Sequence, residues 1–173
     1  IIAVHLSSQF SGTYLSSKKA AERITKEFNK EIFVFDSKNI SGGLGLLVLK
    51  IVKSIEAGLS YNEIKNSLVG WGSRCKIYVS VKDLKYMIKG GRVSKPKGFI
   101  AGILGLNPVI SIDENGKSIL FGKTFSQSAS LNKIYKHIKK TTRKKKIWNY
   151  IIMHANNFEG AEELVGELDH DSI

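Results

Sequence analysis

Near the start of the chain the sequence reads AVHLSSQFSGTYLSSKKAAERI (residues 3–24), and this stretch decides the expected fold. A short apolar run breaks into serines, glycine and threonine, and a helical pattern of apolar residues follows. We therefore expect a strand over residues 1–6 and a helix over residues 11–28. The same order then repeats, because EIFVFDS (31–37) is typical of a strand and GGLGLLVLKIVKSIEAG (42–58) is typical of a mostly buried helix.

The alternation of strands and helices indicates the fold class. A capping box, SYNE (60–63), places Glu63 three residues after Ser60 and predicts the start of one more helix. Strand–helix–strand–helix order favours a parallel α/β sheet. We expect residues 1–72 to form a Rossmann-like parallel α/β lobe, as the first domain of an α/β protein.

The pattern changes after about Gly72, and residues 73–173 are expected to form a second domain, a mixed lobe with an antiparallel sheet and helices. The segment NPVISIDENGKSILFG (107–122) predicts a β-hairpin, because its Asn-Gly pair supplies the positive φ that a tight turn needs. A strand over residues 76–81 and a short helix from Asp83 to Lys89 should precede it. The other expected elements are an apolar helix in KPKGFIAGILG (95–105), a helix over about 126–139, a strand over 147–154 and a helix over about 159–168.

The composition is that of an ordinary globular protein, with 173 residues of which 42% are hydrophobic and 24% are charged. No apolar run approaches the roughly 20 residues that a membrane span needs, and the chain opens without the basic leader of a signal peptide. A single cysteine, Cys75, excludes an intrachain disulfide and favours a reducing, cytoplasmic setting. Because the chain opens in mid-strand without a methionine, we expect it to be the interior of a longer protein, truncated at both ends.

A net charge of +12 raises the question of an anionic partner. Much of this charge lies in the basic run KHIKKTTRKKK (136–146). Its positive residues are Lys136, Lys139, Lys140, Arg143, Lys144, Lys145 and Lys146. Two interpretations are open, a solvated helix end where cations meet the helix dipole and a nucleic-acid contact. We favour the helix end, because Tyr135 and Trp148 are the few aromatic residues beside the run that could stack on bases.

Hydroxyl and backbone N–H groups gather in SSQFSGTY (7–14), where the first strand passes into the first helix. Ligands of open α/β sheets bind at the carboxyl ends of the strands, and a helix start there offers N–H donors and partial positive charge. The candidates for holding a carboxylate or a phosphate are Ser8, Ser11, Gly12 and Thr13. The alternative, equally open at this point, is that Ser11 is only an N-cap and the other polar residues serve the turn. The stretch is not a P-loop, since it lacks GxxxxGK[ST].

Three single residues outside this loop are also candidates. Asp36 ends the second strand at the same edge of the sheet, and we expect it to serve a helix cap or a turn rather than a ligand. Arg92 follows Gly90 and Gly91, where a free guanidinium can clamp a phosphate or the carboxylate of a partner; ordinary solvated charge is the alternative. His154 ends an expected strand and is either structural or directed toward an anion.

The apolar helix expected after Arg92 has two apolar faces, which favour a core on one side and a tunnel or lid on the other; plain core on both sides is the more frequent arrangement. No Ser–His–Asp set, no base beside Cys75, no metal-ligand spacing among the histidines and no paired carboxylates occur in the sequence. These absences favour a carrier over an enzyme, and we expect neither a metal nor a cofactor.

Five segments occur in an order that characterises one family: HLSSQFSGTYLSSKKAA, VFDSKNISGGLGLLV, VKDLKYMIKGGRVSK, GLNPVISIDENGKSILFGKT and IMHANNFEGAEEL. They cover nearly the whole chain, which resembles the DegV family of bacterial fatty-acid-binding proteins. The resemblance implies a two-domain protein that holds one long-chain fatty acid, with its tail in a tunnel and its carboxylate at the domain interface. It also implies that the chain is not itself an enzyme, and that a partner fatty-acid kinase converts the bound carboxylate to an acyl phosphate.

The resemblance implies roles for individual residues. Ser8 would hydrogen-bond the carboxylate, while Ser11, Gly12 and Thr13 would shape the site. Arg92 matches an arginine that contacts the kinase, and His154 begins the HxxN-like turn of the family as a further possible site residue. We infer that the acyl tail is lined by Phe99, Ile100, Ile103 and Leu104. The alternative function is nucleic-acid binding through the basic run of residues 136–146.

Three segments of the family pattern have no counterpart in this chain. They are an opening strand with TDS, a TSQPS segment whose threonine helps to hold the carboxylate, and a closing GPG segment. The loop around Ser8 is therefore expected to be half of the carboxylate site.

Overall fold

The structure, a computed structural model, describes residues 1–92, 105–143 and 146–170. It divides the chain into two compact units. Unit 1 comprises Ile1–Ile77 with Ile112–Lys117, and unit 2 comprises Tyr78–Ser111 with Ser118–Ile173. The expected domain boundary after residue 72 stays a prediction.

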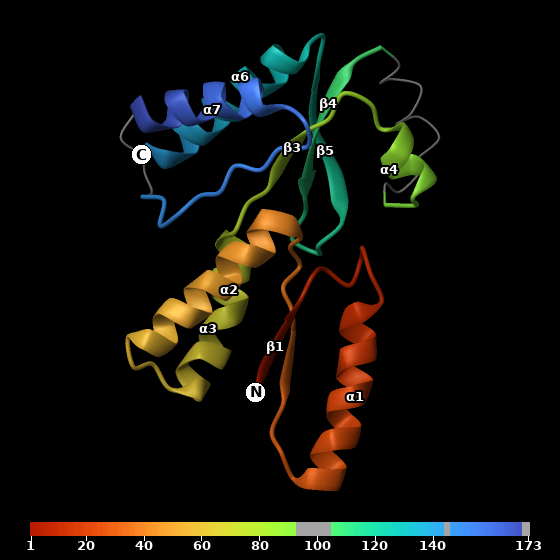
Figure 1. Cartoon of the computed structure of the whole chain (residues 1–173), viewed down its shortest axis with the longest axis vertical. Coiled ribbons are helices and arrows are strands. Elements are labelled where there is room, and N and C mark those ends of the chain that lie inside the picture. Colours follow the sequence, from red (N-terminus) through yellow and green to blue (C-terminus); the bar gives the residue numbers. More distant parts are fainter. Residues whose placement is uncertain (93–104, 144–145, 171–173) are drawn as a thin grey trace. The chain divides into compact units, whose positions relative to one another are not determined.

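Unit 1 is built on a parallel pair of strands, β1 (Ile2–His5) and β2 (Phe33–Asp36). Between them runs α1 (Thr13–Phe28), which lies on one face of the pair. The other face is covered by α2 (Ser41–Glu56) and α3 (Tyr61–Arg74) (Figure 1). This is the expected parallel α/β arrangement, and the parallel register, in which His5 pairs with Asp36, places both strand ends at one edge.

The core of unit 1 lies between the strand pair and the two helices α2 and α3. The register pairs Ile2 with Phe33 and, two residues further, Val4 with Phe35, so alternate side chains enter the same core. They pack against buried side chains of the helices, namely Ile51, Ile64 and Leu68. The burial of these apolar groups is the main force that holds the unit together.

The predicted capping box at the start of α3 is confirmed. The Glu63 N–H donates to Ser60 Oγ at 3.4 Å, and the Ser60 N–H donates to Glu63 Oε2 at 2.8 Å. Two N–H groups that a helix start leaves without partners are satisfied in this way.

Unit 2 is built on a three-stranded sheet in the order β3 (Tyr78–Ser80), β4 (Asn107–Ile112) and β5 (Ser118–Thr124). β3 and β4 are antiparallel, and β4 and β5 form the predicted hairpin, whose turn contains Gly116 with φ of 84°. On one face lies the short helix α4 (Lys85–Lys89), and on the other lies α6 (Gln127–Thr142) (Figure 1). The last helix, α7 (Phe158–His170), packs on α6.

Different side chains of the sheet meet the two sets of helices. On the α4 side, Leu84 packs with Ile110 of β4 in a small apolar cluster. On the α6 side, three rings meet edge to face, with centroids 4.7 to 5.2 Å apart: Tyr78, Phe121 and His137. The antiparallel sheet and its helices match the mixed lobe that the sequence predicts.

One expected element of unit 2 is wrong. Residues 147–154 form no strand in the structure, and the side chains of Ile151 and Met153 are 52% and 62% exposed. The apolar and aromatic residues of this segment have strand propensity, but a strand is stable only when its backbone groups pair with a neighbouring strand. The apolar helix expected over residues 95–105 falls almost entirely outside the described residues.

None of the helices in the described ranges combines the length and the apolar character that crossing a bilayer requires.

Candidate functional site

The loop after β1 begins with a serine that serves the fold. Ser7 is completely buried, and its hydroxyl donates to the carbonyl oxygen of Gly116 at 2.8 Å. The same hydroxyl accepts a hydrogen bond from the Gln9 N–H at 3.2 Å, and the Ser7 N–H donates to the Asn39 carbonyl at 2.8 Å. With these bonds made, Ser7 anchors the loop and is not available to a ligand.

The next serine, Ser8, forms a hydrogen bond through its backbone but none through its hydroxyl within the described residues. The Ser8 N–H donates to Asp36 Oδ1 at 3.2 Å. Its side chain is half-buried, and its hydroxyl has no hydrogen-bond partner among the residues that the structure describes. A hydroxyl in a fixed, half-buried place with unused hydrogen-bonding capacity is suited to a polar ligand.

Asp36 positions this loop from the end of the neighbouring strand. Its Oδ1 atom accepts from the Lys38 N–H at 3.0 Å as well as from Ser8, which closes a turn directly after β2. The expectation that Asp36 serves a turn is confirmed, whereas it does not cap the following helix: Ile40 is the N-cap of α2 and no side chain caps it.

The start of α1 follows within the same loop. Gly12 is the N-cap, with no side-chain cap, and Ser11 Oγ accepts from the Thr13 N–H at 3.3 Å. The alternative in which Ser11 is the N-cap is therefore wrong by one residue. Ser11 is half-buried, while Gly12 and Thr13 are exposed, so the start of α1 and its partial positive charge are open to solvent, four residues after Ser8 in the chain.

A buried polar layer beneath the loop was missed from the sequence. Asn39 Nδ2 donates to the carbonyl oxygens of Ser37 at 2.9 Å and Gly72 at 3.3 Å, and the Ser37 N–H donates to the His5 carbonyl at 3.0 Å. Ser37 and Asn39 are 1% and 4% exposed. The available signal was the series DSKN, in which three turn-forming side chains follow a strand directly.

The charges around the loop limit the kind of anion that it suits. Residues 6–13 contain no Lys or Arg, and the carboxyl group that accepts a hydrogen bond from the loop is that of Asp36. Neutral hydroxyl and N–H donors can hold a single negative charge, but a phosphate carries about −1.5 to −2 at neutral pH and is repelled more strongly by Asp36. The geometry therefore fits a carboxylate better than a phosphate.

Arg92 lies in unit 2, at the end of α4. Its side chain is exposed, and its Nη1 atom donates to the Gly90 carbonyl at 2.7 Å. The expectation of a free guanidinium is therefore corrected, because one N–H is tied to the turn that carries it.

His154, the remaining candidate, also lies in unit 2. It is exposed, its Nδ1 atom accepts from the Asn157 N–H at 3.3 Å, and its ring meets Phe158 edge to face at 5.7 Å. These contacts serve the turn into α7. The four loop residues Ser8, Ser11, Gly12 and Thr13 thus lie together in unit 1, whereas Arg92 and His154 belong to unit 2.

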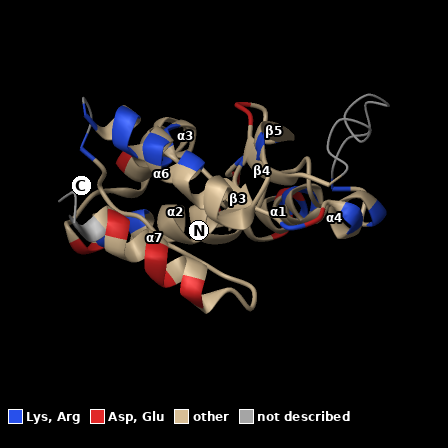
Figure 2. Ribbon diagram, turned by 90° about the horizontal axis from the view of Figure 1, so that it is seen from above, with Lys and Arg blue, Asp and Glu red and all other residues tan. Residues whose placement is uncertain are grey.

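The predicted tail-lining residues, Phe99, Ile100, Ile103 and Leu104, fall outside the described residues, as do Lys144 and Lys145 of the basic run. The other cations of that run are described and are exposed on α6 and just beyond it, where Figure 2 shows the basic residues of the helix in blue. Lys133, Lys136, Lys140 and Arg143 recur at helical spacing, and we call them the α6 basic stripe.

Two other groups with reactive chemistry have structural surroundings. The Cys75 thiol lies 3.6 Å from the Gly43 carbonyl, and burial raises the pKa of this thiol, which disfavours the nucleophilic thiolate. Within the described ranges no three His, Cys, Asp or Glu side chains are grouped so that they could hold a metal ion.

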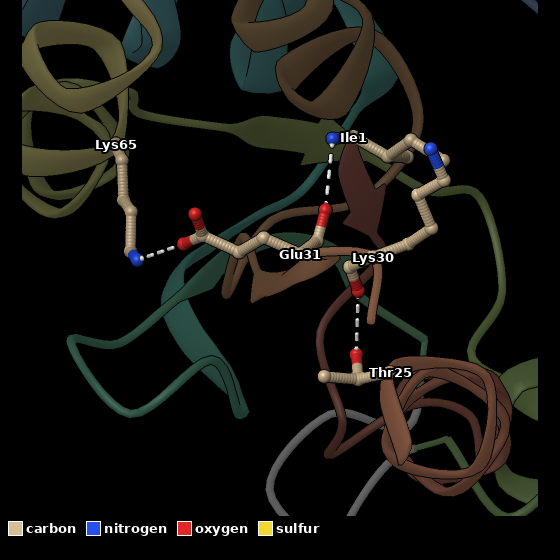
Figure 3. Close-up of polar contacts among 5 residues, drawn as sticks. All are labelled: Ile1, Thr25, Lys30, Glu31 and Lys65. Atoms are coloured by element: carbon tan, nitrogen blue, oxygen red, sulfur yellow. Dashed lines mark hydrogen bonds and ion pairs between the residues drawn. The ribbon is translucent and has the colours of Figure 1, made fainter. Parts of the chain in front are cut away.

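The polar contacts at the opposite end of the strands join chain segments. Lys65 Nζ lies 2.8 Å from Glu31 Oε1 and lowers the pKa of that carboxyl, while the Ile1 nitrogen donates to the Glu31 carbonyl at 3.2 Å (Figure 3). Thr25 Oγ1 donates to the Lys30 carbonyl at 2.8 Å. These bonds fix the connection from α1 to β2, and the groups are exposed at the surface of the unit.

Comparison with known proteins finds a family model and curated relatives that match most of the chain. The family model described as an uncharacterised protein of the DegV family matches residues 1–172. A DegV domain-containing protein of Staphylococcus aureus (strain COL) is 32% identical over 164 residues, which are 95% of this chain and 57% of that protein.

Solved structures have the same fold. The crystal structure of DegV from Bacillus subtilis, described as a fatty acid binding protein, is 28% identical with a TM-score of 0.84, over 98% of this chain and 59% of that one. The Streptococcus pneumoniae fatty acid kinase (Fak) B3 protein, loaded with linoleic acid, is 23% identical with a TM-score of 0.85, over 99% of this chain and 60% of that one, and this likeness supports the fold alone. The chain spans about three-fifths of the length of these relatives.

Proposed function

The chain belongs to the DegV family, and from this membership we propose that it is a lipid-binding carrier for one long-chain fatty acid. The carboxylate of the fatty acid is held at the loop of Ser8, Ser11, Gly12 and Thr13. The apolar tail lies against Phe99, Ile100, Ile103 and Leu104. The relative from Bacillus subtilis, itself described as a fatty acid binding protein, supports this choice of ligand.

One observation carries the proposal: the backbone of Ser8 is anchored, and its hydroxyl bonds no residue that the structure describes. Ser7 and Asp36 fix the loop on both sides of this hydroxyl. The Ser8 hydroxyl then donates to a carboxylate oxygen, in a charge-assisted hydrogen bond that is stronger than one between neutral groups. The N–H groups at the start of α1 add a favourable field for the same negative charge.

The absence of cations in the loop is consistent with a carrier that must release its ligand. Neutral donors hold a carboxylate without a buried ion pair, and the apolar tail supplies most of the affinity, about 0.8 kcal/mol for each buried CH₂ group. In this proposal the chain binds and orients the fatty acid. His154 stabilises the turn before α7 and does not contact the ligand.

A partner kinase forms the second step of the proposal. A carboxylate oxygen of the bound fatty acid attacks the γ-phosphorus of ATP, the bond from that phosphorus to the β–γ bridging oxygen breaks, and ADP leaves, so the products are an acyl phosphate and ADP. The partner supplies the nucleotide site. Arg92 of the carrier contacts this partner, in line with the position of its GGRV motif in the family pattern.

The test measures fatty-acid binding with one changed hydroxyl. Lipids extracted from the purified full-length protein should contain a long-chain fatty acid, and labelled oleate should bind to it. Ser8→Ala should weaken oleate binding about 10- to 150-fold, because a charge-assisted hydrogen bond contributes roughly 1.5–3 kcal/mol. Ser128→Ala, which removes an exposed serine of α6, is the matched control. No bound fatty acid and no oleate binding would refute the carrier function, and equal affinity in Ser8→Ala would remove Ser8 from the site.

The α6 basic stripe supports a second candidate function, nucleic-acid binding. Its cations are exposed along one face of a helix that contains no Asp or Glu. The carrier proposal is preferred because the stripe lacks a row of exposed aromatic residues on which bases could stack.

A further inference from the structure

The turn after β2 fixes a lysine beside the loop that holds the carboxylate in the proposed function. The Lys38 N–H and the Ser8 N–H donate to the same atom, Asp36 Oδ1, at 3.0 Å and 3.2 Å. Because both backbone nitrogens lie within hydrogen-bond distance of one oxygen, the backbone of Lys38 lies next to that of Ser8. The flexible four-carbon stem of a lysine allows its ammonium group to reach across so short a separation.

The residues on both sides of Lys38 are buried and bonded, so the turn leaves the lysine side chain at the surface between them. Ser37 and Asn39 are 1% and 4% exposed, whereas Lys38 is exposed. The Asn39 N–H donates to Ser37 Oγ at 3.1 Å, and the Asn39 carbonyl accepts from the Ser7 N–H at 2.8 Å. A Cβ added at Gly116 would lie 3.2 Å from the Lys38 Cβ, so the stem of the lysine begins against this glycine. The buried frame that carries Ser8 therefore also fixes where the Lys38 side chain begins.

The backbone of Lys38 is in the left-handed region, with φ of 52°. A residue with a Cβ atom enters this region at a cost in free energy, whereas glycine does so readily. Strain of this kind is an observation from which a functional hypothesis starts, provided that the side chain has chemistry to contribute. Lys38 contributes a positive charge next to a proposed anion site, which a glycine in its place would not.

The charged groups around this lysine are mostly acidic. Asp36 bonds the turn itself, and the hairpin turn that Lys38 contacts carries Asp113 and Glu114 together with Lys117. Asp113 Oδ1 is occupied by two backbone N–H groups of its own turn, at 2.8 Å and 2.9 Å. Within the ranges that the structure describes, no carboxylate forms an ion pair with the Lys38 ammonium group. The positive charge of Lys38 is therefore available to a ligand.

A carboxylate bound at Ser8 is repelled by the Asp36 carboxylate unless a cation offsets that charge. Neutral hydroxyl and N–H donors supply hydrogen bonds but no net charge. An exposed ammonium group supplies the opposite charge at a small desolvation cost, because water still reaches it, and it forms no buried ion pair that would oppose release of the ligand. Lysine suits this role better than arginine, since its compact, mobile charge attracts an anion without requiring two hydrogen bonds of fixed geometry.

We propose that Lys38 is a specificity-determining residue of the carboxylate site, whose ammonium group favours ionised fatty acids over uncharged lipids with the same chain. The inference rests on the proposed function, because it requires the carboxylate of the ligand to lie at Ser8. It adds a residue from the neighbouring strand end to the loop of residues 8–13. It also assigns the selection between charged and uncharged lipids to a single exposed cation.

The test compares the binding of oleate and of oleyl alcohol, which has the same chain and no charge, to the delipidated full-length protein. Lys38→Met keeps an unbranched side chain and removes the charge. It should weaken oleate binding about three- to fivefold at about 0.01 M salt, the size expected of one exposed charge pair, and leave oleyl alcohol binding unchanged. At about 1 M salt the difference from the wild type should disappear, because charges are then screened over about 3 Å. Lys38→Arg should retain the preference for oleate, and Lys26→Met, which removes an exposed lysine in the last turn of α1, is the control and should leave both affinities unchanged.

A second variant separates the charge of Lys38 from its place in the fold. Lys38→Gly should weaken oleate binding as Lys38→Met does, while its thermal unfolding midpoint stays at or above that of the wild type, because glycine adopts φ of 52° without strain. Unchanged oleate affinity in Lys38→Met at low salt would refute the role of Lys38 and leave the carrier function standing. Equal losses of affinity for oleate and oleyl alcohol would also refute it, since the effect would then not depend on the charge of the ligand. Failure of the wild-type protein to bind oleate would refute the carrier function itself.

Discussion

The Ser7 hydroxyl and the Gly116 carbonyl oxygen form a buried hydrogen bond of 2.8 Å across 109 positions of the sequence. The bond joins two parts of unit 1, the loop after β1 and the turn at residues 112–117. Both residues are buried, so no water replaces a lost partner. The Ser7 side chain is thus part of the frame that carries the neighbouring Ser8.

Ser7→Ala should lower the free energy of unfolding by about 1–3 kcal/mol, because the Gly116 carbonyl and the Gln9 N–H lose a buried partner. Urea denaturation followed by circular dichroism measures the loss. Ser8→Ala is the adjacent control and should change the free energy of unfolding by less than about 0.5 kcal/mol, as its hydroxyl bonds no described residue. Equal losses in the two variants would contradict the different roles of these serines.

Gly116→Ala should destabilise the protein by more than about 1 kcal/mol, because Gly116 has φ of 84° and an added Cβ would collide with Ser7 Oγ. A Cβ there would also lie 3.2 Å from the Lys38 Cα atom, which is backbone and moves little. Gly45→Ala is the matched control, since that exposed glycine of α2 has open space around it and the change should stabilise the helix by roughly 0.5–1 kcal/mol. Destabilisation by Gly45→Ala of the same size would argue against a specific effect at the turn.

Local signals in the sequence predicted most of the elements. The capping box of Ser60 and Glu63 and the Asn-Gly hairpin depend on neighbouring residues, and both appear where expected. The strand expected over residues 147–154 failed because strand formation depends on a neighbouring strand, which propensity does not encode.

The site was predicted less completely than the fold, for a related reason. Ser7 and Ser8 are adjacent and have the same side chain. Only the direction of each side chain decides which hydroxyl is buried and bonded within the fold and which is left for a ligand. That direction follows from Gly116, 109 residues away, and no periodic pattern reports a contact at this separation. The role of Asp36 was partly visible, because an Asp followed by Ser-Lys-Asn indicates a turn, but its bond to the Ser8 N–H was not.

Asp36→Ala and Asp36→Asn should separate positioning from charge at this loop. Asn keeps the oxygen that accepts from the Ser8 and Lys38 N–H groups, whereas Ala removes it. We expect Asp36→Ala to weaken oleate binding several-fold and to lower the free energy of unfolding by about 1 kcal/mol. Asp36→Asn should bind oleate at least as tightly as the wild type, because it also removes a negative charge near the carboxylate. Weaker binding by both variants to the same extent would show that the charge itself is required.

The Cys75 thiol should make stability depend on pH in the alkaline range. Burial raises the pKa of this thiol in the folded protein above its value in the unfolded chain. Its contribution is therefore complete below the unfolded pKa, about 8.5, and is lost as the pH rises through the folded pKa. Cys75→Ala should reduce this alkaline loss of stability, measured by urea denaturation at a series of pH values.

Thiol labelling gives an independent measurement of the same effect. Cys75 should react with iodoacetamide much more slowly in the folded protein than in urea at the same pH, because the thiolate is the reactive form. Tyr78, whose pKa is also raised by burial, contributes with the same sign, so Tyr78→Phe serves as the control for the alkaline series. Fast labelling of the folded protein, with a stability profile unchanged by Cys75→Ala, would contradict a half-buried thiol of raised pKa.

The α6 basic stripe distinguishes the carrier from a nucleic-acid-binding protein through its dependence on salt. Contact of its four cations with four phosphates of a single strand gives a slope of about −3 in log K against log salt, so affinity falls roughly fifty-fold from 50 to 200 mM salt. We expect only such weak, salt-sensitive binding of single-stranded DNA, measured by fluorescence anisotropy. Lys136→Glu with Lys140→Glu should abolish it while oleate binding persists, since a tail held by apolar contacts responds little to salt. Tight, sequence-dependent binding of nucleic acid that survives high salt, in a protein that holds no fatty acid, would reverse the choice between the two functions.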